Sequence, residues 1–232
     1  MTDTIPAAFA AAVRRDPTVP LLTWYDDASG DRTELSGATL ANWVSKTANL
    51  LVDGAGLGPG DTATVLLPPH WQTAAILLGA WSAGLAVGAS GDILFTSPAG
   101  YDEAAAEAAG DRYATGLLPL AMPLRELPPG FADYTVEVRQ FGDFFTPVRP
   151  VTAADAAIGD RPHGEIPAAA RAGELGITAG SRVLIDAAAH PDPVDWLLAP
   201  LYAGASIVLC AHLDRDAVEK RVATEKVTVT LT

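Results

Sequence analysis

The stretch TATVLLPPHWQTAAILLGAWSAGLAVGASG, residues 62–91, decides the fold. It contains no Asp, Glu, Lys or Arg, and a membrane-spanning helix needs only about 20 mainly apolar residues. Pro68-Pro69 and His70 interrupt it, however, and glycines dilute its second half. Strands and helices that are buried on all sides also give continuous apolar runs. We therefore predict two buried strands with a buried helix between them, over residues 63–67, 85–89 and 70–83, and no membrane partner.

The residues before this stretch predict a helix, a hairpin and a second helix. Asp26-Asp27-Ala28-Ser29-Gly30 is a polar turn with a glycine between two short apolar runs, which is typical of a β-hairpin. Ser36 is a good N-cap, and apolar residues follow it at helical spacing to about Asp53. An Ala-rich segment over 4–15 predicts a helix at the start of the chain.

The last third of the chain alternates between helical and strand patterns. We predict helices over 166–175, 194–203 and 214–225, and strands over 182–185, 206–210 and 227–231. This alternation favours an α/β fold with sheets flanked by helices on both faces. We expect one domain over residues 1–232, with an alternative division into two lobes, 1–118 and 131–232, joined by a Pro-rich connector.

Composition excludes several classes of function. The chain has 232 residues, 15 basic and 28 acidic side chains, and a net charge of −13. Nucleic acids and anionic membrane surfaces both attract basic proteins, so we expect neither as a partner. One cysteine, Cys210, allows no intramolecular disulfide and no thiolate-rich metal site. The start of the chain has no basic leader segment, so we expect a cytoplasmic protein.

The common catalytic motifs are absent. The Gly-rich segments 54–60 and 176–182 precede strands, whereas a dinucleotide loop must open a helix, so we interpret both as turns. Neither Ser90 nor Ser206 has the glycine on each side at two-residue spacing that a hydrolase nucleophile needs. Cys210 and His212 are too few to define a metal site. We therefore predict no catalytic residue, no metal and no cofactor.

The order of several segments is nevertheless informative. Asp31-Arg-Thr-Glu-Leu-Ser36, Gly56-Leu-Gly-Pro-Gly-Asp61, Val65-Leu-Leu-Pro68 and Ala80-Trp-Ser-Ala-Gly84 follow one another, and Trp196-Leu-Leu-Ala-Pro-Leu-Tyr-Ala-Gly-Ala-Ser206 comes later. This order resembles the N-terminal part of the adenylate-forming superfamily, which includes the acyl-CoA synthetases. The resemblance covers most of residues 20–90 and 150–232. It implies the α/β fold of the N-terminal subdomains of those enzymes.

The chain departs from that superfamily at its phosphate-binding loop. The resemblance places this loop, which is rich in Thr, Ser and Gly and ends in Gly-x-Pro-Lys, near residues 155–168. The hydroxyl cluster and the lysine are missing there, and Asp160 and Glu165 are present. Carboxylates without a cation would repel ATP phosphates. We therefore interpret Asp160, His163, Gly164 and Pro167 as a degenerate phosphate-loop region.

Three functions remain open at this point. The first is a non-catalytic interaction or regulatory domain, which we expect to form a homodimer through apolar surface. The second is a module that binds a small hydrophobic acid or a nucleotide. The third is an adenylate-forming ligase that another chain completes.

The resemblance also implies an acyl or aryl pocket beside His190 and Trp196. In the family, the segment that contains this histidine lines the pocket of the acid. In the alternative interpretation, Trp196 is a core residue and His190 caps a helix.

Overall fold

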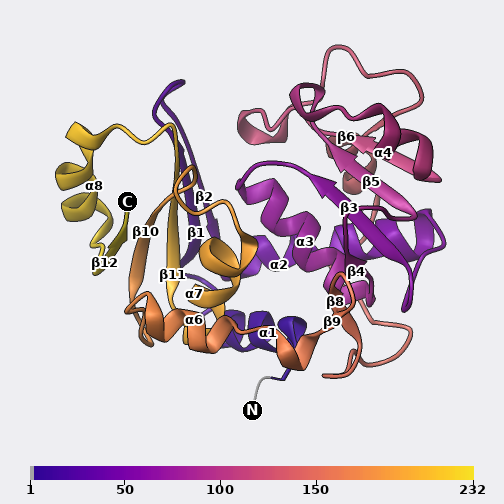
Figure 1. Ribbon diagram of the computed structural model, residues 1–232. Coiled ribbons are helices and arrows are strands. Elements are labelled where there is room, and N and C mark those ends of the chain that lie inside the picture. Colours follow the sequence, from indigo (N-terminus) through magenta and orange to yellow (C-terminus); the bar gives the residue numbers. More distant parts are fainter. Residues whose placement is uncertain (1–2) are drawn as a thin grey trace.

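The computed structural model describes residues 3–232 and contains two β-sheets with helices between them and on their outer sides (Figure 1). The predicted α/β fold is therefore confirmed. No helix in the described part of the chain is both long and apolar enough to cross a membrane.

The first sheet has five strands in the order β12-β10-β11-β1-β2. These strands are β1 Pro20–Asp26, β2 Asp31–Ser36, β10 Arg182–Asp186, β11 Ser206–Ala211 and β12 Val229–Leu231. β1 and β2 form the predicted hairpin, and β1 runs parallel to β11, with Asp26 opposite Ala211. The sheet thus joins the N-terminal hairpin to the last third of the chain.

The second sheet has seven strands in the order β7-β6-β5-β3-β4-β8-β9. These strands are β3 Thr62–Leu66, β4 Ala86–Val87, β5 Ile93–Thr96, β6 Asp111–Ala114, β7 Ala132–Asp133, β8 Ala156–Ile158 and β9 Arg161–Pro162. Its strands pair in parallel except for the hairpin of β8 and β9. Each sheet takes strands from both 1–118 and 131–232, so the sheets do not follow the alternative division into two lobes.

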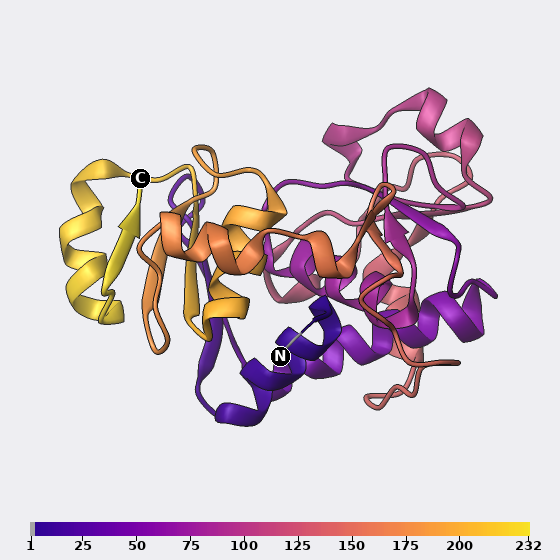
Figure 2. The same ribbon diagram turned by 60° about the horizontal axis from the view of Figure 1, so that its bottom comes forward.

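Helices fill the space between the sheets and cover their outer faces. The helices are α1 Ile5–Arg15, α2 Gly37–Asn49, α3 Trp71–Ala83, α4 Glu103–Ala108, α5 Tyr134–Glu137, α6 Ala168–Glu174, α7 Ala199–Ala203 and α8 Val218–Glu225. α1, α2, α3, α6 and α7 contribute to the main core between the sheets. α8 lies on the outer side of the first sheet in both views (Figures 1 and 2).

α3 is the central helix, and its sequence explains its position. Twelve of its residues are buried, because the helix packs on α2 and lies between the two sheets. His70 caps its N-terminus, and Gly84 ends it in the left-handed conformation. The Trp81 Nε1–H donates to the carbonyl of Ala157 at 2.8 Å, which ties α3 to β8. The uncharged stretch of the sequence therefore forms the predicted strand, buried helix and strand, but the second strand is shorter than predicted, with two half-buried residues, Ala86–Val87.

Candidate functional site

A cavity of about 510 Å³ lies between the two sheets, where their parallel strands end. The first sheet contributes residues at the carboxyl ends of β1, β10 and β11, and the second contributes the turns after β3 and β6. The lining includes Trp24, Asp26, Asp31, Pro69, His70, Leu117, Ala187, Ala211 and His212. Small molecules bind to open α/β sheets at the carboxyl ends of the strands. The cavity is therefore the candidate site.

His70 reaches this cavity because it stands at the turn between β3 and α3. Its Nδ1 accepts the backbone N–H of Gln72 at 3.1 Å, which is the N-cap bond of α3. Burial lowers the pKa of His70 to about 3, against a weaker opposing effect of the Asp26 carboxylate. The imidazole is thus neutral at pH 7, and its proton must lie on Nε2. Within the described residues, this buried Nε2–H has no acceptor.

Trp24 adds a second unpaired donor beside His70. It lies in the middle of β1, is 6% exposed, and its ring meets the His70 imidazole edge to face at 4.3 Å between centroids. The Trp24 Nε1–H also lacks an acceptor in the described part of the chain. A buried donor without a partner costs about 1–3 kcal/mol, so it is a candidate for an external acceptor.

The charged groups of the cavity are mainly acidic. Asp26 accepts from the ring nitrogen Nδ1 of His212 at 2.8 Å and from the backbone N–H of Ala28 at 2.9 Å. Partial burial raises the pKa of Asp26, but the two bonds together outweigh this effect and hold the pKa below its usual value. Asp31 is the second carboxylate, and no Lys or Arg occurs among the described residues of the lining.

The turn after β6 forms one wall of the cavity and has an unusual backbone. Leu117 lines the cavity with a φ of 53°, and Leu120, close behind it, has a φ of 56°. Positive φ is unfavourable for leucine, and such residues cluster in segments that contact ligands or move. Leu120 is also 81% exposed, so its side chain gains nothing from burial.

The degenerate phosphate-loop region has an ordinary local structure. Asp160 is exposed at the turn of the β8–β9 hairpin. Gly164 lies in a short 3-10 turn, and its backbone N–H donates to the carbonyl of Ala153. Pro167 precedes α6. His163 is turned inward and 2% exposed, and its Nδ1 accepts the backbone N–H of Ile5 at 3.3 Å. These four residues do not converge on one cavity.

His190 and Trp196 lie close together in the chain but have different surroundings. Trp196 is 1% exposed and packed in the main core, in line with its interpretation as a core residue. The His190 ring bonds to Asp195 at 3.2 Å, and Asp195 is also held by Arg171 at 2.6 Å. The side chain that accepts from the first turn of the following helix is Asp192, not His190.

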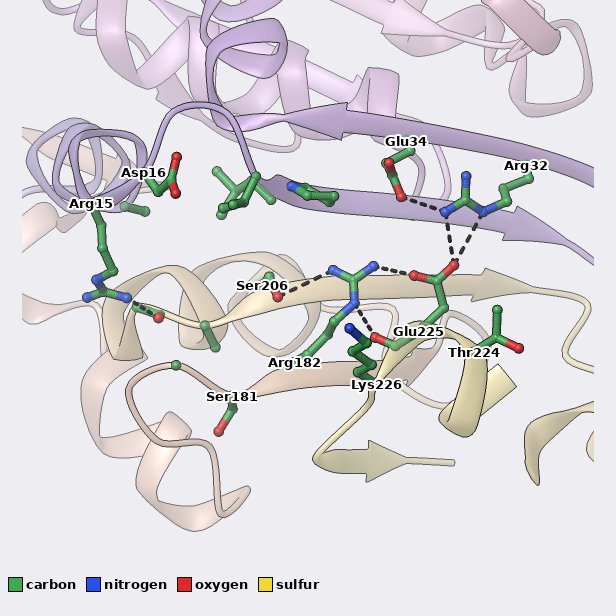
Figure 3. Close-up of a pocket in the computed structure, with 17 residues that line it drawn as sticks. Arg15, Asp16, Arg32, Glu34, Ser181, Arg182, Ser206, Thr224, Glu225 and Lys226 are labelled. Carbon is green, nitrogen blue, oxygen red and sulfur yellow. Dashed lines mark hydrogen bonds and ion pairs between the residues drawn. The ribbon is translucent and has the colours of Figure 1, made fainter. Parts of the chain in front are cut away.

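A second cavity, of about 660 Å³, lies at the amino ends of β1, β10 and β11, between the end of α1 and α8 (Figure 3). At its centre, Glu225 of α8 accepts from Arg182 of β10 and, at 3.0 Å, from Arg32 of β2. Arg182 also donates to Thr23 at 3.0 Å. Each charged group in this network has a partner, so the network explains how α8 is attached to the sheet.

Sequence reasoning placed His70 only at the start of a helix and did not select Trp24. The one available signal was position: His70 follows the Pro-Pro turn at the end of a predicted buried strand. Trp24 gave no signal, because an aromatic residue in a strand is ordinary core.

The comparisons with solved structures agree on the fold. The chain resembles an acyl-CoA synthetase of Brucella canis, with a TM-score of 0.74, 18% identity and coverage of 96% of this chain and 46% of that one. It resembles the N-terminal domain of FACL13 from Mycobacterium tuberculosis, with a TM-score of 0.72, 11% identity and coverage of 98% and 62%. It also resembles MatB of Rhodopseudomonas palustris, with a TM-score of 0.72, 17% identity and coverage of 99% of this chain and 49% of that one. The protein thus has the fold of the N-terminal part of acyl-CoA synthetases and spans about half the length of such chains.

No protein-family model matches the chain. It is, however, 41% identical over 246 aligned positions to a protein of Mycobacterium tuberculosis named "TIGR03089 family protein". The alignment covers 97% of this chain and 98% of that protein. At this identity over nearly the whole of both chains, the protein belongs to the TIGR03089 family.

Proposed function

We propose that the protein is a non-catalytic domain with the acyl-CoA synthetase fold. The observation that supports this most directly is the conformation of residues 155–165. The resemblance in sequence places the phosphate-binding loop there, and the segment forms a short hairpin and a 3-10 turn that carry neither the hydroxyl cluster nor the lysine of that loop.

The charges of this segment also support the proposal. Binding a triphosphate requires cations and preorganised donors. Asp160 and Glu165 outnumber the single cation of the segment, Arg161. The nearby Arg149 is bonded through both terminal nitrogens to Asp155, at 2.8 and 2.9 Å. His163 adds no charge, because burial lowers its pKa to about 4.

Exchange of radioactive pyrophosphate into ATP tests this proposal. The assay is run with magnesium and a panel of fatty, aryl and amino acids. We expect no acid-dependent signal above a blank without protein. A signal that requires both the metal and one of the acids would overturn the proposal and favour the alternative of an adenylate-forming ligase. Repeating the assay with a cell extract from the same organism would show whether another chain completes such a ligase.

A second function, binding of a small molecule, is supported by the cavity between the sheets. Two buried ring N–H groups, those of His70 and Trp24, lack acceptors beside a space of about 510 Å³. We propose that a ligand supplies the missing acceptor. The proposed binding site therefore differs from the pocket beside His190 and Trp196 that the sequence predicts, because neither residue lines this cavity. A thermal-shift screen of acids, amides, amines, AMP and CoA tests it, and a screen without any saturable stabilisation would count against it.

We also propose that the protein acts in regulation or interaction as a homodimer. Several large apolar side chains are exposed: Leu120, Met122, Phe144 and Val148. Exposed apolar side chains favour association where they gather into a patch, and we propose that these four contribute to the interface.

A further inference from the structure

The cavity between the sheets combines buried hydrogen-bond donors with carboxylates. We propose that it selects an uncharged or cationic molecule that carries a hydrogen-bond acceptor, such as a carboxamide, and that it rejects carboxylic acids. This inference rests on the proposal that the cavity binds a small molecule, and it specifies the chemistry of that molecule.

The donors require an acceptor. Nδ1 of His70 accepts the backbone N–H of Gln72, so in the neutral ring the proton is on Nε2, and Nε2 can only donate. The Nε1–H of Trp24 is a donor in every state of the side chain. Both atoms are shielded from water and unpaired among residues 3–232. A carbonyl oxygen has two lone pairs and can accept from both groups.

The carboxylates set the charge that the ligand can carry. Asp26 is 18% exposed at its side chain, and its pKa is held below the usual value, so it is ionised at neutral pH. Asp31 lies across the hairpin from it, with Asp26 and Asp31 paired in the register of β1 and β2. The described lining contains no Lys or Arg, and its one cationic candidate, His212, is bonded to Asp26, so no free cation among the described lining residues faces an anion that enters the cavity.

One wall of the cavity has an unfavourable backbone conformation. Leu117 lines the cavity in a left-handed conformation that leucine rarely adopts. The turn that contains it is bordered by the exposed Leu120. Both donor nitrogens are buried, so a ligand reaches them only if the lining moves, and movement of this turn would also relieve its unfavourable backbone.

Benzamide and benzoate provide a matched pair of probes. They have nearly the same shape and differ in charge and in the amide N–H₂, which can donate to Asp26. Binding is followed by ¹H–¹⁵N spectra at pH 7, up to about 10 mM, because fragments of this size bind in the millimolar range. We expect benzamide to bind at least about tenfold more tightly than benzoate, and to shift the signals of the Trp24 indole and the His70 imidazole.

Two pairs of variants connect the selection to the named groups. Asp26→Asn should reduce the preference for benzamide about threefold or more. Asp111→Asn is its control and should leave the preference unchanged, because Asp111 begins β6 and the cavity is lined by the turn that follows the end of β6. Trp24→Phe keeps an aromatic ring and should weaken benzamide binding about fivefold. Trp196→Phe removes the same indole N–H from the core away from this cavity and is the control.

The outcomes separate this inference from the proposal on which it rests. If benzoate binds as tightly as benzamide, with shifts at Trp24 and His70, the cavity binds small molecules but the inferred selection is wrong. If neither probe shifts these two signals, both the inference and the proposed binding site are wrong. If Asp26→Asn and Asp111→Asn have equal effects, Asp26 does not determine the selection.

Discussion

His163 illustrates how one residue can leave a predicted site. Its side chain is 2% exposed, and Nδ1 accepts the backbone N–H of Ile5 in the first turn of α1. That turn needs acceptors because its N–H groups have no partners within the helix. The histidine is therefore part of the contact between α1 and the segment after β9, and it is not available to an anion.

Replacing His163 by Asn should flatten the pH dependence of stability between about pH 6.5 and pH 4. Burial lowers the pKa of His163 in the folded protein to about 4, below its value of about 6.5 in an unfolded chain. The unfolded state therefore binds the proton first as the pH falls. The stability that is present above pH 6.5 is then lost by up to about 1.4 kcal/mol per pH unit. Urea denaturation of both proteins across this range measures the difference.

Asparagine retains an oxygen acceptor for the Ile5 N–H, so the fold should persist in this variant. His163→Gln also removes the titrating ring and should flatten the pH dependence to the same extent. A pH dependence in both variants as steep as in the unmodified protein would contradict the assignment to His163.

Glu225→Gln should lower the free energy of unfolding at pH 7 by about 2–4 kcal/mol, because it leaves Arg182 partly buried without its charge partner. Burial alone would raise the pKa of Glu225, but bonds from Tyr25, Arg182 and Arg32 lower it to about 2. Its stabilising contribution is present above about pH 4.5 and is lost as the pH falls towards 2. Denaturation curves of the variant should lack this acid-dependent loss.

Glu219→Gln is the matched control, because Glu219 is an exposed residue of the same helix. If Glu219→Gln costs as much stability as Glu225→Gln, the network of Figure 3 does not hold α8 in place.

At the scale of elements, the end of α3 depends on one glycine. Gly84 has a φ of 89°, and a Cβ there would lie 3.0 Å from Cγ of Pro59. Gly84→Ala should therefore lower the free energy of unfolding by about 1–3 kcal/mol. Gly173→Ala, in α6, meets no atom within 4 Å and should raise it by about 0.5–1 kcal/mol. Equal effects of the two substitutions in thermal or urea denaturation would refute this prediction.

Most elements could be predicted from the sequence because their patterns are local. The Ser36 cap, the turn at 26–30 and the apolar run of α3 each specify a structure within a few residues. β5 was not predicted, because its four buried residues, Ile93–Thr96, are too few to show a period. β8 and β9 lie where the resemblance suggested a loop, and their two or three residues gave no strand signal.

The candidate site could not be predicted in the same way. Its cavity brings together Trp24, His70, Leu117 and His212, which are far apart in the chain. Only the pairing of β1 with β11 and the packing of α3 between the sheets place them together. His190 and Trp196 were selected through the resemblance, and Trp196 lies in the core.

At the scale of the whole molecule, surface and charge act in opposite directions on association. The exposed apolar side chains at Leu120, Met122, Phe144 and Val148 favour contact between copies. The net charge of −13 opposes it through repulsion that salt screens.

Size-exclusion chromatography with light scattering should therefore give a mass of twice the 24.0 kDa chain mass, with the dimer fraction increasing with salt. Leu120→Ser with Phe144→Ser should shift the equilibrium towards the monomer. A mass of one chain across a wide range of protein and salt concentrations would exclude the homodimer.

The pairing of β1 with β11 also has a consequence for synthesis of the chain. The ribosome completes the hairpin of β1 and β2 early, but the other neighbour of β1, Ser206–Ala211, emerges only after residues 37–205 have been made. Until then, one side of β1 has free N–H and C=O groups, which invite pairing with other nascent chains. Polypeptides that stall before residue 206 should therefore be preferred clients of chaperones, and folding of the first sheet should be slow, because it depends on contacts between distant segments.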